Sequence, residues 1–204
     1  MPRVLAAFLD SRPNVKADLM MRASHVVEDL IASQQFDMGF AETPAPRASI
    51  NQVDYELECV CILPADDPLR SAEVITPADL DGRPMAALFD HHGTALRTET
   101  VFREAGVRFN KRFELRTFLP GLTFVAAGAC WMICDMITAY SHLLEAPEGA
   151  RLAIRRFRPR ISNSVSILTP GYATQSMAGR AFIRELETAV ERMQVEVEKV
   201  LTDN

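Results

Sequence analysis

The order of hydrophobic patterns along the chain constrains the fold more than any single motif does. Short apolar runs typical of buried strands, such as LECVCILP (57–64) and MAALFD (85–90), are separated by stretches in which apolar residues recur every three or four positions. Strand patterns that alternate with helical patterns predict an α/β fold with parallel strands. We therefore expect α/β structure throughout the chain.

The first forty residues follow the same order. Residues 3–11 have a helical pattern, NVKADLMM (14–21) alternates as a strand does, and FDMGFA (36–41) is a short apolar strand. Between the two strands, Ser24 stands where an N-cap is expected, before a helical run that ends at Ile31. This helix–strand–helix–strand order predicts parallel pairing of the two strands.

Capping residues mark three further helices. TPADLDG (76–82) has the composition of a compact helix start, Thr94 begins a helix that ends at Gly106, and Thr117 begins one that Gly128 closes. The other expected elements are strands at 112–117, 130–134, 150–159 and 162–170, a helix followed by a Pro/Gly turn between 138 and 150, and a final helix from about Ser176 to Leu201.

The length of 204 residues allows one large domain or two small lobes. The polar segment ADDPLRSAEV (65–74) is a credible crossing between lobes. We expect residues 66–149 to form one α/β lobe, and residues 1–65 with 150–204 to form the other. Two lobes with two crossings predict a ligand cleft between them, where the carboxyl ends of strands meet helix N-termini.

Charge and hydropathy exclude two classes of protein. The net charge is −5, whereas a nucleic-acid-binding domain normally has a basic excess. The basic run RRFRPR (155–160) is interpreted as a solvated or subunit-facing edge, with a phosphate site as the alternative. No apolar run approaches the ~18 residues of a membrane span, and the start lacks a secretion signal, so we expect a cytoplasmic protein without a membrane partner.

The four cysteines are interpreted as buried small hydrophobic residues. Their spacings, C-x-C at Cys59 and Cys61 and C-x3-C at Cys130 and Cys134, differ from the C-x2-C of zinc ribbons. The four histidines lie in other segments. We therefore expect neither a metal site nor a cofactor.

A family resemblance covers essentially the whole chain. The order PRVLAAFLDSRP, FDMGFAE, LECVCILPADDPL, VITPADLDG, GTALRTETVFREAG and LTFVAAGACWMICD resembles the effector-binding domain of LysR-type transcriptional regulators. Here DDPL replaces the HPL of the family, and Cys130 stands where the family has a second glycine. The resemblance implies two Rossmann-like lobes of the periplasmic-binding-protein type II fold, joined by two crossover strands.

The resemblance also implies an effector sensor rather than an enzyme. A small acid, amino acid or opine-like ligand would bind in the interlobe cleft and control DNA binding and transcription. The motifs TPADLDG, GTALR and GACWMICD are most similar to those of opine- and amino-acid-responsive regulators. The implied partners are a second copy in a homodimer through these domains, a tetramer for the full-length protein, and operator DNA bound through another domain.

Two parts of the family pattern do not occur in this sequence. They are the N-terminal winged helix-turn-helix with its linker helix, and the first strand of the effector domain, which would precede Pro2. We therefore expect that the chain is a fragment or that its true start lies upstream, and that it does not bind an operator alone.

The resemblance places the candidate effector-binding residues mainly at helix starts. Thr94 would donate to a ligand carboxylate, with a plain N-cap as the alternative role. Arg116 would pair with a carboxylate, or be a surface strand residue. Asp135, at the end of a buried strand, would hold an ammonium or guanidinium group, or cap the following helix. The complete set is Ser24, His92, Gly93, Thr94, Arg116, Thr117, Phe118 and Asp135.

Two other functions stay open at this point. A solute-binding protein of the transport type would have the same fold, but it requires export. An enzyme on this fold would use His91 or His92 as acid or base, although the sequence has no recognisable pair of nucleophile and base.

Overall fold

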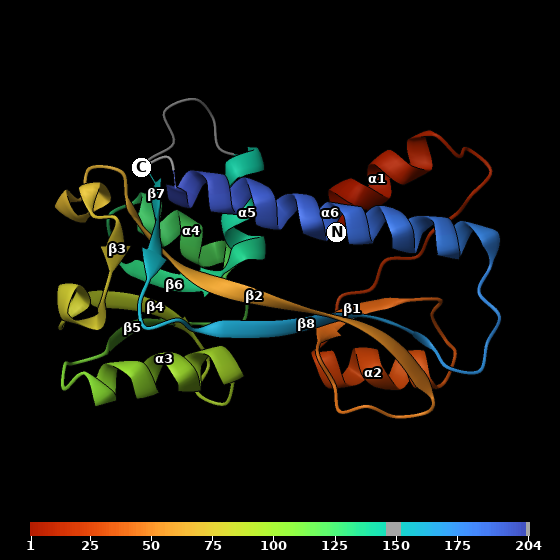
Figure 1. The fold of residues 1–204 in the computed structure, drawn as a ribbon, viewed down its shortest axis with the longest axis horizontal. Helices are drawn as coiled ribbons and strands as arrows, with labels where there is room; N and C mark the ends of the chain where they lie inside the picture. Colours follow the sequence, from red (N-terminus) through yellow and green to blue (C-terminus); the bar gives the residue numbers. More distant parts are fainter. Residues whose placement is uncertain (146–151, 203–204) are drawn as a thin grey trace. The chain divides into compact units, whose positions relative to one another are not determined.

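The computed structural model describes residues 1–145 and 152–202, which form two compact units. Unit 1 comprises Met1–Glu56 and Ser164–Arg192, and unit 2 comprises Leu57–Asn163 and Met193–Asn204. The elements that run through both are strands β2 (Ile50–Pro64) and β8 (Ser162–Pro170) and helix α6 (Met177–Thr202) (Figure 1). The units are defined by internal packing, and the assignment of 66–149 and its flanks as regulatory lobes stays a prediction.

Unit 1 is built on a short antiparallel pair of strands. Strand β1 (Gly39–Glu42) pairs with β8, with Gly39 opposite Leu168. Helix α2 (Ser24–Ala32) covers one face of this pair, where Ile31 packs with Leu168. A Cβ atom at Gly39 would lie 2.6 Å from Val27 Cγ1, so glycine allows this close approach of α2.

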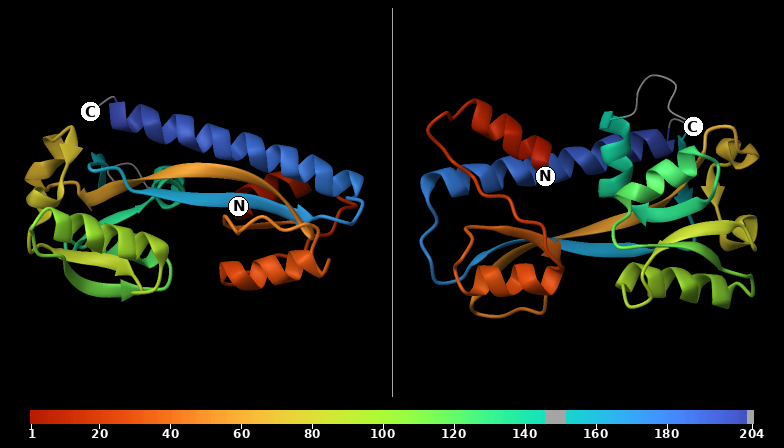
Figure 2. Two further views of the ribbon diagram at one scale, coloured as in Figure 1. Left: turned by 60° about the horizontal axis from the view of Figure 1, so that its bottom comes forward. Right: turned by 180° about the vertical axis from the view of Figure 1, so that it is seen from behind.

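Helix α1 (Pro2–Asp10) lies on the other side of β1 from α2, as Figures 1 and 2 show. It packs on the first turns of α6, where the rings of Phe8 and Phe182 meet edge to face with centroids 5.1 Å apart. Arg12, just beyond the helix, pairs with Glu185 at 3.2 Å. Helices α1 and α6 thus form a layer on one side of β1, and α2 forms the layer on the other side.

The predicted strand at 14–21 is wrong. Residues Lys16–Arg22 are neither helix nor strand, and none of their backbone N–H groups donates a hydrogen bond within the described part of the chain. A strand needs a neighbour, and among the described strands β1 pairs only with β8, which runs antiparallel to it. The parallel pairing expected for this part of the chain is therefore also wrong.

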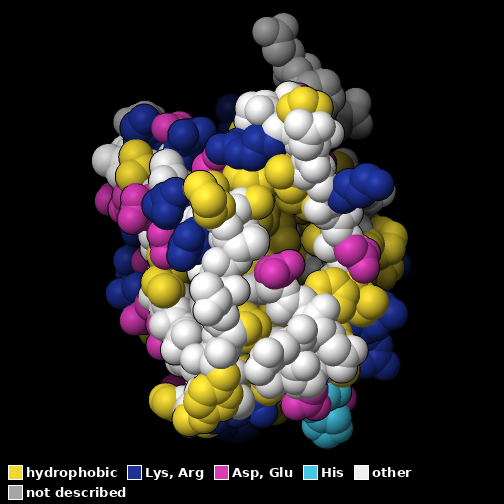
Figure 3. All heavy atoms as spheres, turned by 90° about the vertical axis from the view of Figure 1, so that its right-hand side faces the viewer, with side chains coloured by type: hydrophobic (Ala, Val, Ile, Leu, Met, Phe, Trp, Pro, Cys, Tyr) yellow, Lys and Arg dark blue, Asp and Glu magenta, His cyan; other side chains and the backbone are white. Residues whose placement is uncertain are grey.

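The irregular segment borders a cavity of about 340 Å³ in unit 1. Figure 3 faces this end of the unit and shows hydrophobic side chains deep in a hollow. Apolar side chains of α1, α2 and α6 line it, including Phe8, Ile31 and Phe182. In the segment itself, Met21 is 75% exposed, so its side chain stays outside the core.

Unit 2 contains the parallel strands that the alternating pattern predicts. Strand β4 (Pro84–Leu88) pairs in parallel with β5 (Asn110–Leu115) and with β6 (Trp131–Asp135). Beyond β6 the sheet continues antiparallel, since β6 pairs with β2 and β2 pairs with β7 (Leu152–Phe157). The two-residue strand β3 (Val74–Ile75) runs parallel to β7. The sheet is thus mixed.

The helices of unit 2 follow the predicted order with shifted ends. They are the 3-10 helices η1 (Pro68–Ser71) and η2 (Pro77–Leu80) and the α-helices α3 (Gly93–Glu104), α4 (Leu119–Ala126) and α5 (Met136–Glu145). The expected helix at 76–82 is therefore only a 3-10 turn, although its capping box between Thr76 and Asp79 is present. The helix predicted after residue 138 corresponds to α5, whereas the Pro/Gly turn predicted before residue 150 lies outside the described residues.

Candidate functional site

Most of the predicted site residues follow the carboxyl ends of three strands in unit 2. Strand β4 ends at Leu88, β5 at Leu115 and β6 at Asp135, and because these strands are parallel their ends share one edge of the sheet. The Phe89 N–H donates to the Leu115 carbonyl at 3.1 Å, which holds two of these ends together. The residues in this region are His92, Gly93, Thr94, Arg116, Thr117, Phe118 and Asp135.

Helix α3 begins with a histidine cap. His92 occupies the N-cap, and its Nδ1 accepts a hydrogen bond from the Thr94 N–H at 3.2 Å. The predicted capping by Thr94 is therefore wrong by two positions, because α3 begins at Gly93 and Thr94 already lies in its first turn. Gly93 is the first residue of the helix.

The Thr94 hydroxyl is a buried polar group of this region that lacks a hydrogen bond in the described part of the chain. The residue is 1% exposed, and its Oγ1 has no hydrogen-bond partner among the residues that the structure describes. Buried hydroxyls are normally paired, and an unpaired one costs roughly 1–3 kcal/mol. Thr94 adjoins a narrow apolar gap with Leu88, Phe118 and Ile133, which has no room for a water molecule. A ligand atom reaches this hydroxyl only if one of these side chains moves.

Arg116 directly follows β5, and its guanidinium lies over the ring of Phe89. Its guanidinium is 4.8 Å from the centroid of the Phe89 ring, and that ring lies edge to face with His92 at 5.6 Å. The side chain is exposed and has no carboxylate partner among the described residues. It is therefore available for an anion.

Helix α4 lacks the predicted cap. Its N-cap is Phe118, which is buried, and no side chain caps the helix. Thr117 is exposed and stands one residue too early. A proline in the first turn has no N–H to satisfy, which reduces the need for a side-chain cap.

Asp135 caps helix α5. Its Oδ1 accepts from the Thr138 N–H at 2.8 Å, and its Oδ2 accepts from the Thr138 hydroxyl at 3.3 Å. Burial raises the pKa of this carboxyl, and the hydrogen bonds from Thr138 oppose the rise. The capping alternative is thus what the structure contains, and a cationic ligand group would have to share the carboxylate with this cap.

Ser24 belongs to unit 1 and is not the predicted N-cap of α2. Ala23 holds that position, and Ser24 is the first helical residue. The Ser24 hydroxyl instead accepts a hydrogen bond from the Glu42 N–H at 3.2 Å and so joins α2 to β1. Its contact with a ligand stays a prediction.

The cysteines are buried, as the sequence predicts, and free. Burial raises the pKa values of Cys59 and Cys61 to about 12 and that of Cys130 to about 11, and it raises the pKa of Cys134 well above the usual value. Among the residues described, no group of three or more histidine, cysteine or acidic side chains could hold a metal ion.

Trp131 begins strand β6 and has polar contacts. Its Nε1 donates to the Asp67 carboxylate at 2.9 Å, and the Arg83 guanidinium lies 4.7 Å from its ring centroid. Arg83 also pairs with Asp67 at 3.0 Å, so the three side chains form one cluster.

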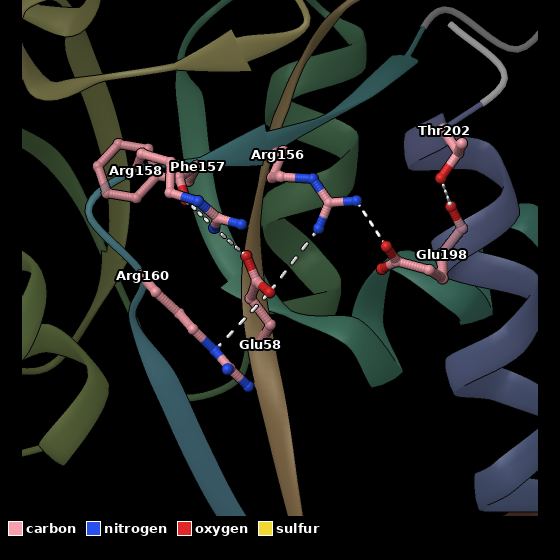
Figure 4. Close-up of polar contacts among 7 residues, drawn as sticks. All are labelled: Glu58, Arg156, Phe157, Arg158, Arg160, Glu198 and Thr202. Atoms are coloured by element: carbon pink, nitrogen blue, oxygen red, sulfur yellow. Dashed lines mark hydrogen bonds and ion pairs between the residues drawn. The ribbon is translucent and has the colours of Figure 1, made fainter.

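Two carboxylates, Glu58 and Glu198, pair with three of the four arginines of the basic run at 155–160, as Figure 4 shows. Glu58 of β2 pairs with Arg156 at 3.9 Å and with Arg160 at 3.7 Å, and it also bonds Arg158. Arg156 reaches Glu198 at 2.6 Å as well. Sequence reasoning missed Glu58 because its partners lie about a hundred positions away, and no local pattern links them.

Comparison with known proteins gives a consistent answer. The family described as LysR substrate binding domain matches residues 1–191. The transcriptional activator protein LysR of Escherichia coli (strain K12) is 25% identical over 203 residues, which cover 99% of this chain and 64% of that protein. This chain therefore spans less than two thirds of that relative. None of the helices described is long and apolar enough to cross a membrane.

Solved structures agree on the fold. The regulatory domain of CcmR from Synechocystis PCC6803, in complex with 2-PG, aligns with a TM-score of 0.72 at 18% identity over 92% of this chain and 89% of that one. The effector binding domain of QuiR, in complex with shikimate, aligns with a TM-score of 0.65 at 13% identity over 97% and 90%. These likenesses confirm the predicted fold class, and the relatives named here are regulators, not enzymes. With the family match over residues 1–191, the chain belongs to the LysR substrate-binding domain family.

Proposed function

We propose that the chain senses a small acid or an amino-acid-like effector at the shared edge of β4, β5 and β6. The observation that carries this proposal is the Thr94 hydroxyl, which is buried at the start of α3 and has no hydrogen-bond partner within residues 1–145 and 152–202. The ligand-bound structures of the fold support a small molecule, since QuiR holds shikimate, a carboxylic acid. An anion is also favoured by the N–H groups of a helix N-terminus.

Each residue of the site has a distinct role in this proposal. Thr94 donates its hydroxyl to a carboxylate, and the exposed Arg116 guanidinium neutralises that carboxylate. Asp135 holds a cationic group of the ligand, which would suit an amino acid or an opine. The backbone of Gly93 and the side chains of His92, Thr117 and Phe118 border the ligand, and Ser24 contributes from unit 1.

The effector would act through a conformational equilibrium. A ligand that binds one arrangement of the protein more tightly shifts the population toward it. In the proposed regulator, ligand in the cleft between lobes controls operator DNA binding by a separate domain, within a homodimer through these domains and a tetramer of the full-length protein in the cytoplasm. The solute-binding and enzymatic alternatives are not favoured, because the relatives are transcriptional regulators.

A thermal-shift screen tests the site. Amino acids, opines and aromatic acids, shikimate included, are added to the chain, and a ligand that binds only the folded state raises the melting temperature. We expect Thr94→Val and Asp135→Asn to reduce the shift that a hit produces. Thr98→Val is the matched control, because its hydroxyl already donates to the Thr94 carbonyl at 2.8 Å. Hits that keep their full shift in both variants would place the effector elsewhere.

A further inference from the structure

The Arg97 guanidinium lies on the first turn of its own helix, α3. A Cβ atom added to Gly93 would be 3.2 Å from Arg97 Nη1, so the side chain folds back over the start of the helix. Within the described residues its polar contact is a long hydrogen bond, 3.5 Å, to Asn163 Oδ1. The guanidinium is exposed, and it pairs with no carboxylate in the part of the chain that the structure describes.

The start of α3 is an unfavourable place for a cation unless an anion joins it, because the N–H groups of a helix start carry partial positive charge. The N–H groups of Gly93 and Ala95 donate to no group among the residues described, and the buried Thr94 hydroxyl has no partner there. Asp90, which precedes the helix, pairs with Lys111. Hydrogen-bond donors and positive charge therefore gather at this turn, an arrangement that binds an anion.

Arg97 and Asp135 both act on the electrostatics of Cys59. Cys59 of β2 stands opposite Asp135 of β6 in the antiparallel pairing of these strands. Burial is the main cause that raises the pKa of the Cys59 thiol to about 12, the charge of Asp135 adds to the rise, and the charge of Arg97 opposes it. A cation and an anion are thus within electrostatic reach of one strand position. They match the carboxylate and the ammonium group of an α-amino acid.

Arg116 is a second guanidinium beside this helix start. It lies over the ring of Phe89, which meets the ring of His92, the N-cap residue of α3. In the proposed function Arg116 neutralises the carboxylate at Thr94. Because Arg97 lies on that turn itself, it can neutralise this carboxylate, which leaves Arg116 for a second acidic group of the ligand.

We propose that the effector is an acidic amino acid and that Arg97 is a specificity-determining residue for it. This inference rests on the proposed function and names the class of ligand. The α-carboxylate binds Arg97 and the N–H groups of the first turn of α3, the ammonium group binds Asp135, and the side-chain carboxylate binds Arg116. The two guanidinium groups and the one carboxylate of the protein balance the two carboxylates and the one ammonium group of such a ligand.

Matched pairs of acid and amide test the second carboxylate. L-Aspartate, L-glutamate and L-2-aminoadipate, and the side-chain amide of each, are titrated at constant ionic strength, and the rise of the melting temperature with concentration gives the Kd. We expect an acid of this series to bind, and its amide to bind about tenfold more weakly because it loses a charge-assisted contact. Equal affinity of acid and amide, or binding by no acid of the series, overturns the proposal.

Variants of the two arginines separate their roles. Arg97→Gln should weaken binding of an acid and of its amide alike, by about tenfold, because both ligands have the α-carboxylate. Arg116→Gln should weaken binding of the acid alone, and so remove its advantage over the amide. Arg103→Gln is the matched control and should keep the parent affinities, since Arg103 lies at the far end of the same helix, where it bonds Thr100. Parent affinity in Arg97→Gln overturns the proposal.

The outcomes also separate this inference from the proposed function. A ligand of any class whose thermal shift falls in Thr94→Val supports the effector site. If that ligand has a single carboxylate, or keeps its affinity in Arg97→Gln, the proposed function stands and the inference of an acidic amino acid is wrong. If no ligand depends on Thr94, both are wrong.

Discussion

At the scale of single residues, Thr94 and Asp135 are both polar groups in surroundings that do not favour them. Thr94 has a buried hydroxyl without a partner in the described part of the chain, and Asp135 has a buried carboxyl whose pKa is raised. In each case an apolar or neutral replacement of the same shape removes a cost from the folded protein without ligand. Replacements at these two positions are therefore expected to stabilise the ligand-free protein and to weaken ligand binding.

Thr94→Val should raise the free energy of unfolding by about 1 kcal/mol in the absence of effector, because valine has the shape of threonine without the unpaired hydroxyl. Urea unfolding followed by circular dichroism measures the change. Thr98→Val is the control and should lose stability by a similar amount, since the Thr98 hydroxyl has a partner. A destabilised Thr94→Val protein would mean that the hydroxyl is satisfied in solution.

Asp135→Asn should change how stability depends on pH. Because the folded protein raises the pKa of Asp135 above its usual 3.8, this carboxyl contributes stability below the unfolded pKa, and the contribution is lost as pH rises through the folded pKa. The free energy of unfolding of the parent minus that of Asp135→Asn should therefore fall from pH 3.5 toward neutral pH. Chemical denaturation across this range measures it, and a difference that grows with pH would contradict the raised pKa.

At the scale of elements, local sequence patterns predicted the positions of helices and strands better than they predicted which strands pair. The strand at 85–90 and the helix from Thr94 to Gly106 correspond to β4 and α3, because periodicity and a terminal glycine are local signals. The strand at 14–21 has a clear alternating pattern but no neighbouring strand, and pairing is not visible in a local window. Helix caps were misplaced by one or two residues, since a histidine or alanine gave no N-cap signal.

Gly39→Ala should lower the free energy of unfolding by about 1–3 kcal/mol, because the added Cβ would lie 2.6 Å from Val27 Cγ1 and force α2 away from β1. Thermal or urea unfolding measures the loss. In the double variant with Val27→Ala the clash is relieved, so the two losses should not add. Strict additivity would show that the two positions do not meet.

Glu58→Gln tests the ion pairs that join β2 to β7 in unit 2. It removes the carboxylate shared by Arg156, Arg158 and Arg160, so we expect a loss of about 1–2 kcal/mol from the remaining guanidinium groups, which repel one another. Salt screens such repulsion, and the loss should shrink at 1 M salt. Urea unfolding at low and high salt measures both, and Glu104→Gln, at an exposed position of α3 in the same unit, is the control.

At the scale of the whole molecule, the order of the motifs predicted the family and the fold class, while the contacts that complete the site were not predictable. The edge formed by β4, β5 and β6 follows from strand–helix alternation, and it brings His92, Arg116 and Asp135 to one side of the sheet. The stack of Arg116 on Phe89 and the three arginines on Glu58 depend on side-chain geometry across distant segments. Sequence patterns carry no signal for such contacts.

The fluorescence of Trp131, which lies in a cluster with Asp67 and Arg83, reports on the folding of unit 2. Trp131 is the single tryptophan of the chain, and its indole is held by a carboxylate and a guanidinium within unit 2. Excitation of tryptophan alone therefore reads the environment of this unit, whereas circular dichroism reads the helices of both. When the two signals are recorded in one titration, coincident curves indicate cooperative unfolding, and separated curves give each unit its own midpoint.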